Sequence, residues 1–149
     1  TGDRSGDFLW AGLHATGFAN QPEGRALDDG LELCDCFVTA SVRCAPPQNK
    51  PTPAERDTCA PYLHRELALL RRLRVIVALG AFGWEAAWRA LEPGRRPRPR
   101  FGHGAEAELA GLTLLGCYHP SQQNTFTGKL TPAMRDELLT RARQLANLA

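Results

Sequence analysis

The sequence predicts an α/β fold, arranged as a three-layer α/β/α sandwich around a short central parallel sheet. Two apolar runs, residues 75–79 and 112–118, have the composition of strands. Segments with helical periodicity precede, separate and follow them, and strands that alternate with helices are typical of a parallel sheet with helices on both sides. The run 75–79 is apolar throughout, as expected for a strand covered on both faces.

The first third of the chain is expected to hold one helix and one strand. Ser5 or Asp7 can cap the helix, and Gly17 ends it. Residues 18–31 contain Gly, Pro, Asn and Asp, which predicts a loop. Residues 36–43 are rich in β-branched side chains, which predicts a buried strand.

Proline residues set the expected helix boundaries in the middle of the chain. Thr52 and Glu55 form a capping-box pattern around Pro53, so a helix is expected to begin there. Pro61 is expected to break that helix and to start a second one. The second helix is expected to bury Leu63, Leu67 and Leu70 and to expose Arg65, Arg71 and Arg72.

Two more helices are expected after residues 75–79. Gly80 turns the chain into a helix over residues 82–91, and Thr131 with Pro132 begins the final helix. The expected buried faces are Trp84, Ala87, Trp88 and Leu91 in the first, and Met134, Leu138, Leu145 and Leu148 in the second.

Composition indicates an ordinary globular protein. The 149 residues, 43% hydrophobic and 23% charged, predict a single domain over residues 1–149. No apolar run approaches the roughly 20 residues of a membrane helix. The net charge of +2 is too small to indicate binding to nucleic acid, so any attraction to DNA must come from a local patch of positive charge. Five cysteines without the spacing of a secreted scaffold favour a reducing cytoplasm and metal or cluster ligation, and we expect a monomer.

Two motifs carry the functional information. Residues 117–125 place His119 and a polar run where the strand at 112–118 ends, which is where open α/β sheets handle ligands. Residues 42–53 form a proline-rich loop that contains Asn49 and Lys50. Taken singly, His119 could simply bond nearby backbone, and Asn49 could be an ordinary turn residue.

Together and in this order, the two motifs closely resemble the uracil-DNA glycosylase superfamily, and within it the family 5 (type b) enzymes that carry an iron–sulfur cluster. The resemblance implies an α/β/α domain that hydrolyses the N-glycosidic bond of uracil and other deaminated bases in DNA. In that family an upstream section supplies the first strand, a glycine-rich base-binding loop and a stacking aromatic residue. Since none of these is present in the chain, it is expected to be part of a longer protein.

The resemblance also assigns roles to the motif residues. His119 is implied to donate a hydrogen bond to the departing base, and such a bond accelerates the reaction if it strengthens as charge develops. Asn49 is implied to read the edge of the flipped base, for which an amide offers both donor and acceptor. The remaining motif residues are implied to hold the opened duplex and its phosphates, namely Lys50, Ser121, Gln122, Gln123, Asn124 and Lys129.

Asp3 has two interpretations. As a single residue it is a natural cap for the first helix. By resemblance, an aspartate in this segment takes the place of the polar residue that other families use to position water. It would then orient the attacking water and stabilise the cationic sugar.

Cys44 and Cys59 flank the proline-rich loop. Alone, they could be two structural thiols. By resemblance they supply two of the four thiolates of a [4Fe-4S] cluster, with the other two upstream. Cys34 and Cys36 form a rival pair, for which packing in the core is the expected role, and Cys117 is expected to act as a small hydrophobic residue.

Three functions remain open at this point. The first is a monofunctional DNA glycosylase that uses water, because no lysine occupies a matched catalytic position for a Schiff base. The second is a glycosylase-like module that binds DNA without turnover, and the third is an electron-transfer iron–sulfur protein. The arginines of the loop at 93–100 are equally consistent with a solvated loop or with contacts to DNA phosphates.

Overall fold

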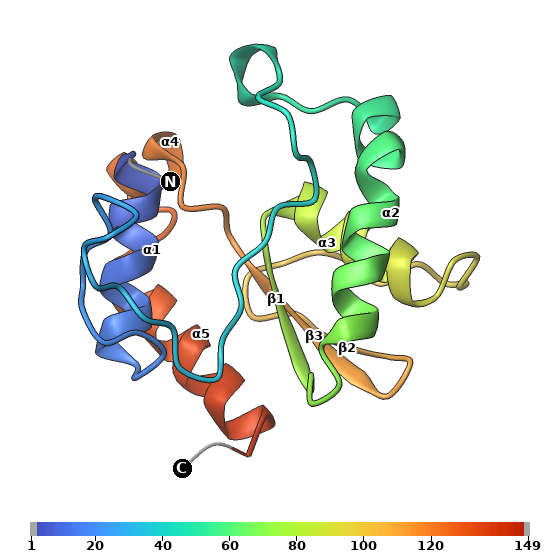
Figure 1. Ribbon diagram of the computed structural model, residues 1–149. Helices are drawn as coiled ribbons and strands as arrows, with labels where there is room; N and C mark the ends of the chain where they lie inside the picture. Colours follow the sequence, from blue (N-terminus) through green and yellow to red (C-terminus); the bar gives the residue numbers. More distant parts are fainter. Residues whose placement is uncertain (1–2, 148–149) are drawn as a thin grey trace. The chain divides into compact units, whose positions relative to one another are not determined.

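The computed structural model describes residues 3–147, except for the side chain of Asn49. The chain divides into two compact units. Unit 1 combines residues up to Phe37 with those from Cys117 onward, and unit 2 is Val38–Gly116. In Figure 1, unit 2 covers the cyan, green and yellow ribbon and the first orange strands. The prediction of a single domain over residues 1–149 stays a prediction.

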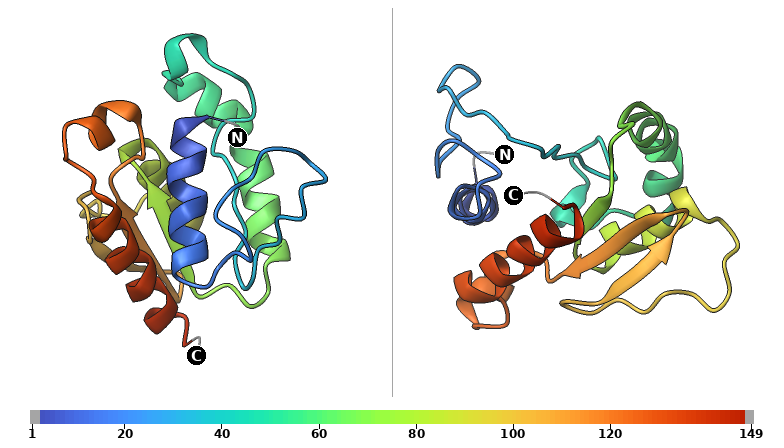
Figure 2. Two further views of the ribbon diagram at one scale, coloured as in Figure 1. Left: turned by 90° about the vertical axis from the view of Figure 1, so that its left-hand side faces the viewer. Right: turned by 90° about the horizontal axis from the view of Figure 1, so that it is seen from below.

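Unit 1 is built from the helices α1 (Arg4–Ala15), α4 (Gln122–Phe126) and α5 (Pro132–Leu145). The helices α1 and α5 lie side by side (Figures 1 and 2). Their contact is close because the α-carbon of Gly12 carries no side chain, and a Cβ there would lie 2.3 Å from Nε of Arg135. The buried cluster of this unit consists of Trp10, Leu13, Phe18, Ala19 and Leu139.

The ends of the unit 1 helices follow local capping rules. Asp3, rather than Ser5 or Asp7, caps α1, since its Oδ1 accepts a hydrogen bond of 2.8 Å from the amide of Gly6. The expected end at Gly17 is confirmed by its positive φ of 79°. The stripe predicted for α5 is only partly correct. Leu138 is buried, Met134 and Leu145 are half-buried, Arg135, Leu139 and Ala142 are also buried, and Leu148 lies outside the described residues.

Unit 2 contains a three-stranded sheet in the order β1-β3-β2. The strands are β1 (Val75–Leu79), β2 (Glu106–Leu109) and β3 (Leu112–Cys117), the last ending at the boundary of the unit. The sequence did not predict β2, which forms an antiparallel hairpin with β3. The two residues between them, Ala110 and Gly111, have φ of 49° and 77°, as the tight primed turn of a hairpin requires. The α/β class is confirmed, with a mixed sheet rather than a purely parallel one.

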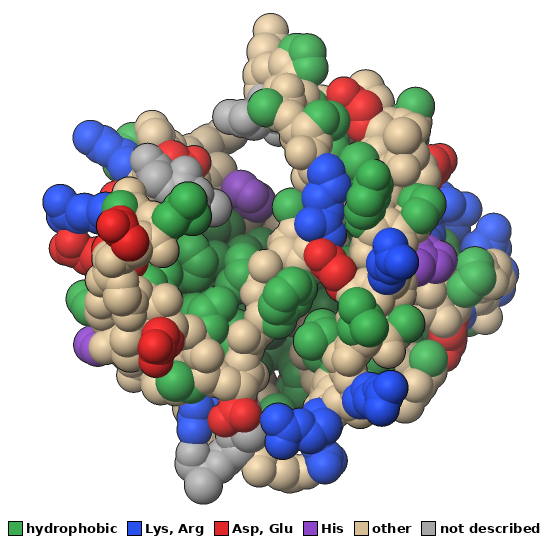
Figure 3. Space-filling view, viewed as in Figure 1, with side chains coloured by type: hydrophobic (Ala, Val, Ile, Leu, Met, Phe, Trp, Pro, Cys, Tyr) green, Lys and Arg blue, Asp and Glu red, His purple; other side chains and the backbone are tan. Residues whose placement is uncertain are grey.

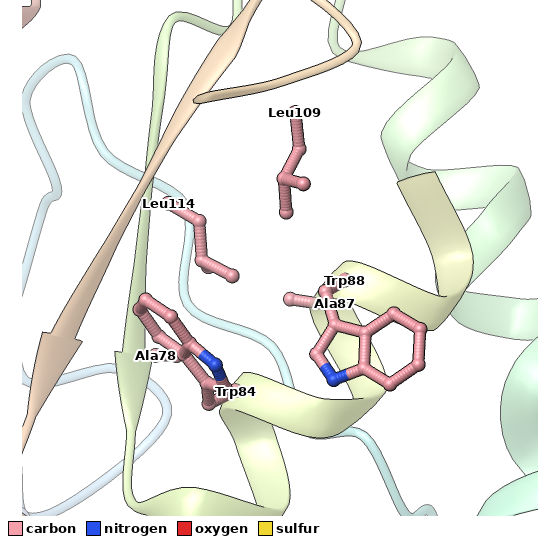
Figure 4. Packing of buried hydrophobic residues seen from close by; sticks show 6 residues of the cluster. All are labelled: Ala78, Trp84, Ala87, Trp88, Leu109 and Leu114. Carbon is pink, nitrogen blue, oxygen red and sulfur yellow. The ribbon is translucent and has the colours of Figure 1, made fainter. Parts of the chain in front are cut away.

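Helices α2 (Pro53–Leu69) and α3 (Ala81–Leu91) complete unit 2. The helix α3 packs on β1, and α2 packs on α3. Figure 4 shows the cluster between α3 and the sheet, in which Trp84 and Trp88 face Leu109 and Leu114. The predicted face of α3 is therefore confirmed, with Leu91 at its partly buried edge.

The break expected at Pro61 is wrong, because α2 runs through this residue. A proline inside a helix removes one backbone hydrogen bond and costs about 3 kcal/mol. The half of α2 before Pro61 is stabilised by its capping box at Thr52 and by the burial of Arg56 and Cys59. The arginines predicted to face outward, Arg65, Arg71 and Arg72, are exposed, and Figure 3 shows basic side chains over this part of the surface.

The strand expected over residues 36–43 is also wrong. The segment is extended but has no strand assignment, and Phe37 and Val38 are 55% and 37% exposed. Branched side chains favour extended backbone, but a strand also needs a neighbour with which to share hydrogen bonds. Among the described residues, this segment is bonded to α2 by the side chains of Thr39 and Arg43 and by the backbone amide of Arg43.

None of the described helices combines the length and apolar character needed to span a membrane.

Candidate functional site

His119 lies in unit 1, two residues after the end of β3, so its predicted position at the end of a strand is confirmed. The polar run after it folds into the short helix α4, which was not expected. Ser121 caps this helix, since its Oγ accepts a hydrogen bond of 3.3 Å from the amide of Asn124. The side-chain amide of Asn124 in turn donates to the carbonyl oxygen of His119 at 2.9 Å. The polar run is therefore anchored to the histidine through backbone and side-chain bonds.

The structure brings Asp3 close enough to His119 for the two to interact electrostatically. The pKa of His119 is lowered from its ordinary value of 6.5, mainly because surrounding protein atoms displace water that would solvate the charged ring. The carboxylate of Asp3 opposes this effect and raises the pKa in part. The environment of His119 therefore favours the neutral ring, although the side chain is exposed.

The exposed face of α4 consists of Gln122, Gln123 and Phe126. Their spacing of three and four residues places them on one side of a helix. Phe126 is 68% exposed, and the guanidinium carbon of Arg4 lies 5.7 Å from the centre of its ring. Phe126 and Arg4 were not among the residues that the sequence predicted for this surface. The cap at Ser121, followed by this spacing, is the signal that could have found the face.

The predicted phosphate-binding lysines lie in different settings. Lys129 is exposed in unit 1, with its Nζ 4.8 Å from the centre of the Tyr118 ring, so a cation–π contact holds it near the histidine motif. Lys50 is exposed in unit 2, directly after the short 3₁₀ helix η1 (Pro47–Asn49). The side chain of Asn49 lies outside the described residues, so its predicted role stays a prediction.

Cys44 and Cys59 line one open pocket in unit 2. Cys44 is exposed in the extended segment, while Cys59 is buried on α2 at 9% exposure. The sulfur of Cys59 accepts a hydrogen bond of 3.4 Å from the backbone amide of Arg43. The other residues that line the pocket are Arg43, Ala54, Glu55, Thr58 and Tyr62.

This arrangement fits half of a cluster site. Among the described residues, no group of three or more His, Cys, Asp or Glu side chains could hold a metal ion. Two sulfurs on one pocket, one of them with an amide donor, match two of the four thiolates of an iron–sulfur cluster and no more. Cys44 and Cys59 are the residues that would hold it.

The remaining cysteines, Cys34, Cys36 and Cys117, lie in unit 1, and two of them pack against other residues. Cys117 is 3% exposed, and burial raises the pKa of its thiol to about 11, which confirms its expected role as a small hydrophobic residue. Cys36 packs against the Trp10 cluster, and burial raises the pKa of its thiol too. Cys34 is exposed, so the expectation of core packing holds for only one member of this pair.

Some arginines of the loop at 93–100 have structural contacts. Nη1 of Arg95 donates to the carboxylate of Glu92 at 2.8 Å and to the carbonyl of Glu108 at 2.7 Å. The guanidinium carbon of Arg98 lies 5.7 Å from the centre of the Trp88 ring. For these two side chains the structural interpretation is favoured over contacts to DNA.

Comparison with known proteins identifies the family. Residues 1–143 match the family model described as "Uracil DNA glycosylase superfamily". The chain belongs to the uracil-DNA glycosylase superfamily. It is also similar to proteins named "Type-5 uracil-DNA glycosylase" in three bacteria: 54% identical over 150 residues in Mycobacterium bovis, 51% over 150 residues in Mycobacterium leprae and 47% over 149 residues in Thermus thermophilus.

Each of these alignments covers 99% of the chain. The chain spans 56% of the length of the Mycobacterium bovis relative, 66% of the Mycobacterium leprae relative and 67% of the Thermus thermophilus relative. The resemblance to type 5 members of the superfamily is therefore confirmed over nearly the whole chain, while each relative has further residues beyond the matched part.

Proposed function

We propose that this protein is a monofunctional DNA glycosylase that hydrolyses the N-glycosidic bond of uracil, and of other deaminated bases, in base excision repair. Superfamily membership and the names of the type 5 relatives support this proposal. The observation that carries it is the pair formed by a neutral His119 and the nearby Asp3 in unit 1. The proposed substrate is DNA, and we propose a cytoplasmic enzyme that acts as a monomer.

His119 acts as an electrophilic donor in this proposal. When the bond between base and sugar breaks, negative charge moves onto a carbonyl oxygen of the departing base. A neutral imidazole can donate a hydrogen bond that strengthens as this charge grows, without having to lose its proton. The lowered pKa of His119 supports this role because it favours the neutral ring.

Asp3 is proposed to act on the sugar and on water. A carboxylate stabilises the positive charge that develops on the sugar, and it can orient the water that attacks. Its bond to the amide of Gly6 is compatible with this role, because a carboxylate has about four lone-pair sites and the cap uses one oxygen. The cap also fixes the position of the carboxylate relative to α1.

The exposed face of α4 is proposed to hold the duplex open after the base has left the stack. The ring of Phe126 can stack in the gap, while the amides of Gln122 and Gln123 can bond base edges. Lys129 and Lys50 are proposed to contact phosphates, with Ser121 and Asn124 holding the helix in place. The proposal that Asn49 reads the base rests on its place in the motif.

The proposed cofactor is a [4Fe-4S] cluster with Cys44 and Cys59 as two of its thiolate ligands. When bound, it would join the two ends of the proline-rich loop through iron–sulfur bonds. The loop carries Asn49 and Lys50, so the ligands would restrict the motion of the residues proposed to meet the base and its phosphate.

The activity is tested by incubating the complete polypeptide with DNA that contains one uracil, and by measuring release of the free base. A monofunctional enzyme releases uracil and leaves an intact abasic strand. Borohydride should trap no covalent complex if neither lysine of this chain forms a Schiff base, and both Lys50 and Lys129 are proposed to bind phosphates instead. Binding to uracil-containing DNA without release of base would instead identify a module without turnover.

A further inference from the structure

The extended segment before Cys44 is fixed to α2 by an exposed side-chain clamp. Nη2 of Arg43 lies 2.5 Å from Oε1 of Glu66 and donates to Oγ1 of Thr39 at 3.1 Å. Thr39 closes the ring of contacts by donating to Oε2 of Glu66 at 2.6 Å. Three side chains, two from the segment and one from α2, therefore satisfy one another although the segment has no strand partner.

The clamp lies on the same face of α2 as the buried cysteine. Cys59, Tyr62 and Glu66 are spaced by three and four residues, which places them along one side of the helix. The guanidinium carbon of Arg43 lies 5.7 Å from the centre of the Tyr62 ring, in cation–π range.

The contacts of Arg43 direct its backbone amide toward the sulfur of Cys59. The side chain of Arg43 binds Glu66 on α2, and the backbone amide of the same residue lies 3.4 Å from Sγ of Cys59. Cys44 is the next residue along the chain. Amide donors to ligating sulfurs and contacts that orient ligands both stabilise and tune metal centres.

We propose that Arg43 is a positioning residue for the cluster. Glu66 binds its guanidinium group, and Thr39 hydrogen-bonds to both side chains. The side chain of Arg43 holds the segment so that Cys44 and Cys59 face one pocket and the amide reaches the sulfur. This inference rests on the cluster included in the proposed function. The side chains of Arg43 and Glu66 are 37% and 22% exposed, and a pair that solvent screens in this way adds little to global stability. The clamp is therefore expected to act on retention of the cluster rather than on the melting temperature.

The experiment uses the complete polypeptide purified without air. Iron per chain is measured first, and the visible absorbance of the cluster is then followed after a chelator is added. Arg43→Met should lose its colour roughly 10-fold faster than the wild type, the lower end of what loss of an orienting partner costs. Arg43→Lys should lose it at an intermediate rate, since a lysine keeps the charge but not the fork of donors. The matched control is Arg65→Met, which removes an exposed arginine of α2 that is not part of the clamp.

Glu66→Gln is the second variant, because it keeps the shape of the anchor and removes its charge. If Arg43 and Glu66 act as one unit, the double variant should lose colour about as fast as Arg43→Met alone. Melting temperatures within the scatter of the wild type show that the fold is intact.

Loss of colour at the wild-type rate in both single variants would overturn the positioning role of Arg43. Uracil release by the same preparations would still support the glycosylase proposal. A wild-type protein that contains no iron would overturn both the proposed cluster and this inference. The glycosylase proposal would still be tested on its own by measuring uracil release.

Discussion

The two units hold their candidate residues by different physical means. In unit 1, helix caps and a backbone-directed hydrogen bond fix the residues around His119: Asp3 caps α1, and the amide of Asn124 binds the carbonyl of His119. In unit 2, an extended segment without a strand partner carries Cys44 and is held by exposed side chains of Arg43 and Glu66. The first arrangement is complete within the chain, whereas the second is suited to be reinforced by a ligand.

The difference extends to electrostatics. At His119, surrounding atoms exclude enough water to lower the pKa of a ring that reaches the surface. At the clamp, hydrogen bonds dominate, since the bond from Arg43 is the main cause that lowers the pKa of Glu66. We therefore expect substitutions in unit 1 to change chemistry directly, and substitutions at the clamp to change how firmly a cofactor is held.

The largest expected effect comes from His119→Ala. Loss of one donor to a developing negative charge slows the chemical step by about 10²–10³-fold, and affinity for DNA should change much less. Single-turnover release of uracil measures the first, and equilibrium binding to an uncleavable analogue measures the second. The control is His14→Ala, an exposed histidine in the last turn of α1. Full activity of His119→Ala would show that the chemistry of unit 1 lies with other residues.

Phe126→Ala should have the next largest effect, and only on paired DNA. Stacking of a base on an aromatic ring is worth about 1–3 kcal/mol, so a loss of about 10-fold is expected on duplex substrate. Single-stranded uracil DNA has no gap to fill and should be cleaved at the wild-type rate. Phe126→Tyr keeps the ring and is the matched control. An equal loss on both substrates would mean that Phe126 supports the position of α4 instead of stacking in DNA.

The parts of this molecule that the sequence predicts are those in which the signal is local. The capping box at Thr52, the apolar run of β1 and the face of α3 each depend on a few neighbouring residues, and all are confirmed. The hairpin strand β2 was missed because its sequence is short, has two glutamates, and becomes a strand only by pairing with β3. The strand predicted over residues 36–43 was wrong for the converse reason, because the segment has the composition of a strand but no neighbouring strand with which to pair.

The candidate site shows the same division. The strand-end position of His119 and the exposure of Lys50 and Lys129 could be expected from the sequence. The pairing of Asp3 with His119 and the contacts of Arg43 and Thr39 with Glu66 could not, because each joins residues far apart in the chain. Family resemblance supplied the two cysteines, and only the structure showed the amide that points at one of them.

Replacing one lysine in each unit tests whether both units face the DNA backbone. Binding weakens linearly with salt on a log–log plot, and each lost phosphate contact should reduce the slope by roughly 1. Lys129→Gln removes a cation of unit 1, and Lys50→Gln removes one of unit 2. The control is Arg71→Gln, exposed just after α2. If the salt dependence of binding falls for only one of the two lysine variants, only the unit that carries that lysine contacts DNA phosphates.

The most specific effect is expected from Asp3→Asn. Asparagine caps helices about as well as aspartate, so α1 should be preserved and only the charge lost. Asp3 raises the pKa of His119, and that pKa, already lowered by burial, should therefore fall further in the variant. Nuclear magnetic resonance titration of the His119 ring measures the shift directly.

The sign of the accompanying stability change follows from proton linkage. A histidine whose folded pKa lies below its unfolded value binds fewer protons when folded, so its contribution to stability is present above about pH 6.5. That contribution is lost as the pH falls through the folded pKa. In Asp3→Asn the loss of stability should therefore extend to lower pH than in the wild type, and urea unfolding at a series of pH values can follow it.

An unchanged His119 titration would show that Asp3 is a helix cap and nothing more. A lowered pKa together with an equal slowing of release for uracil, hypoxanthine and xanthine would support a role on the sugar or on water, because every base leaves the same sugar.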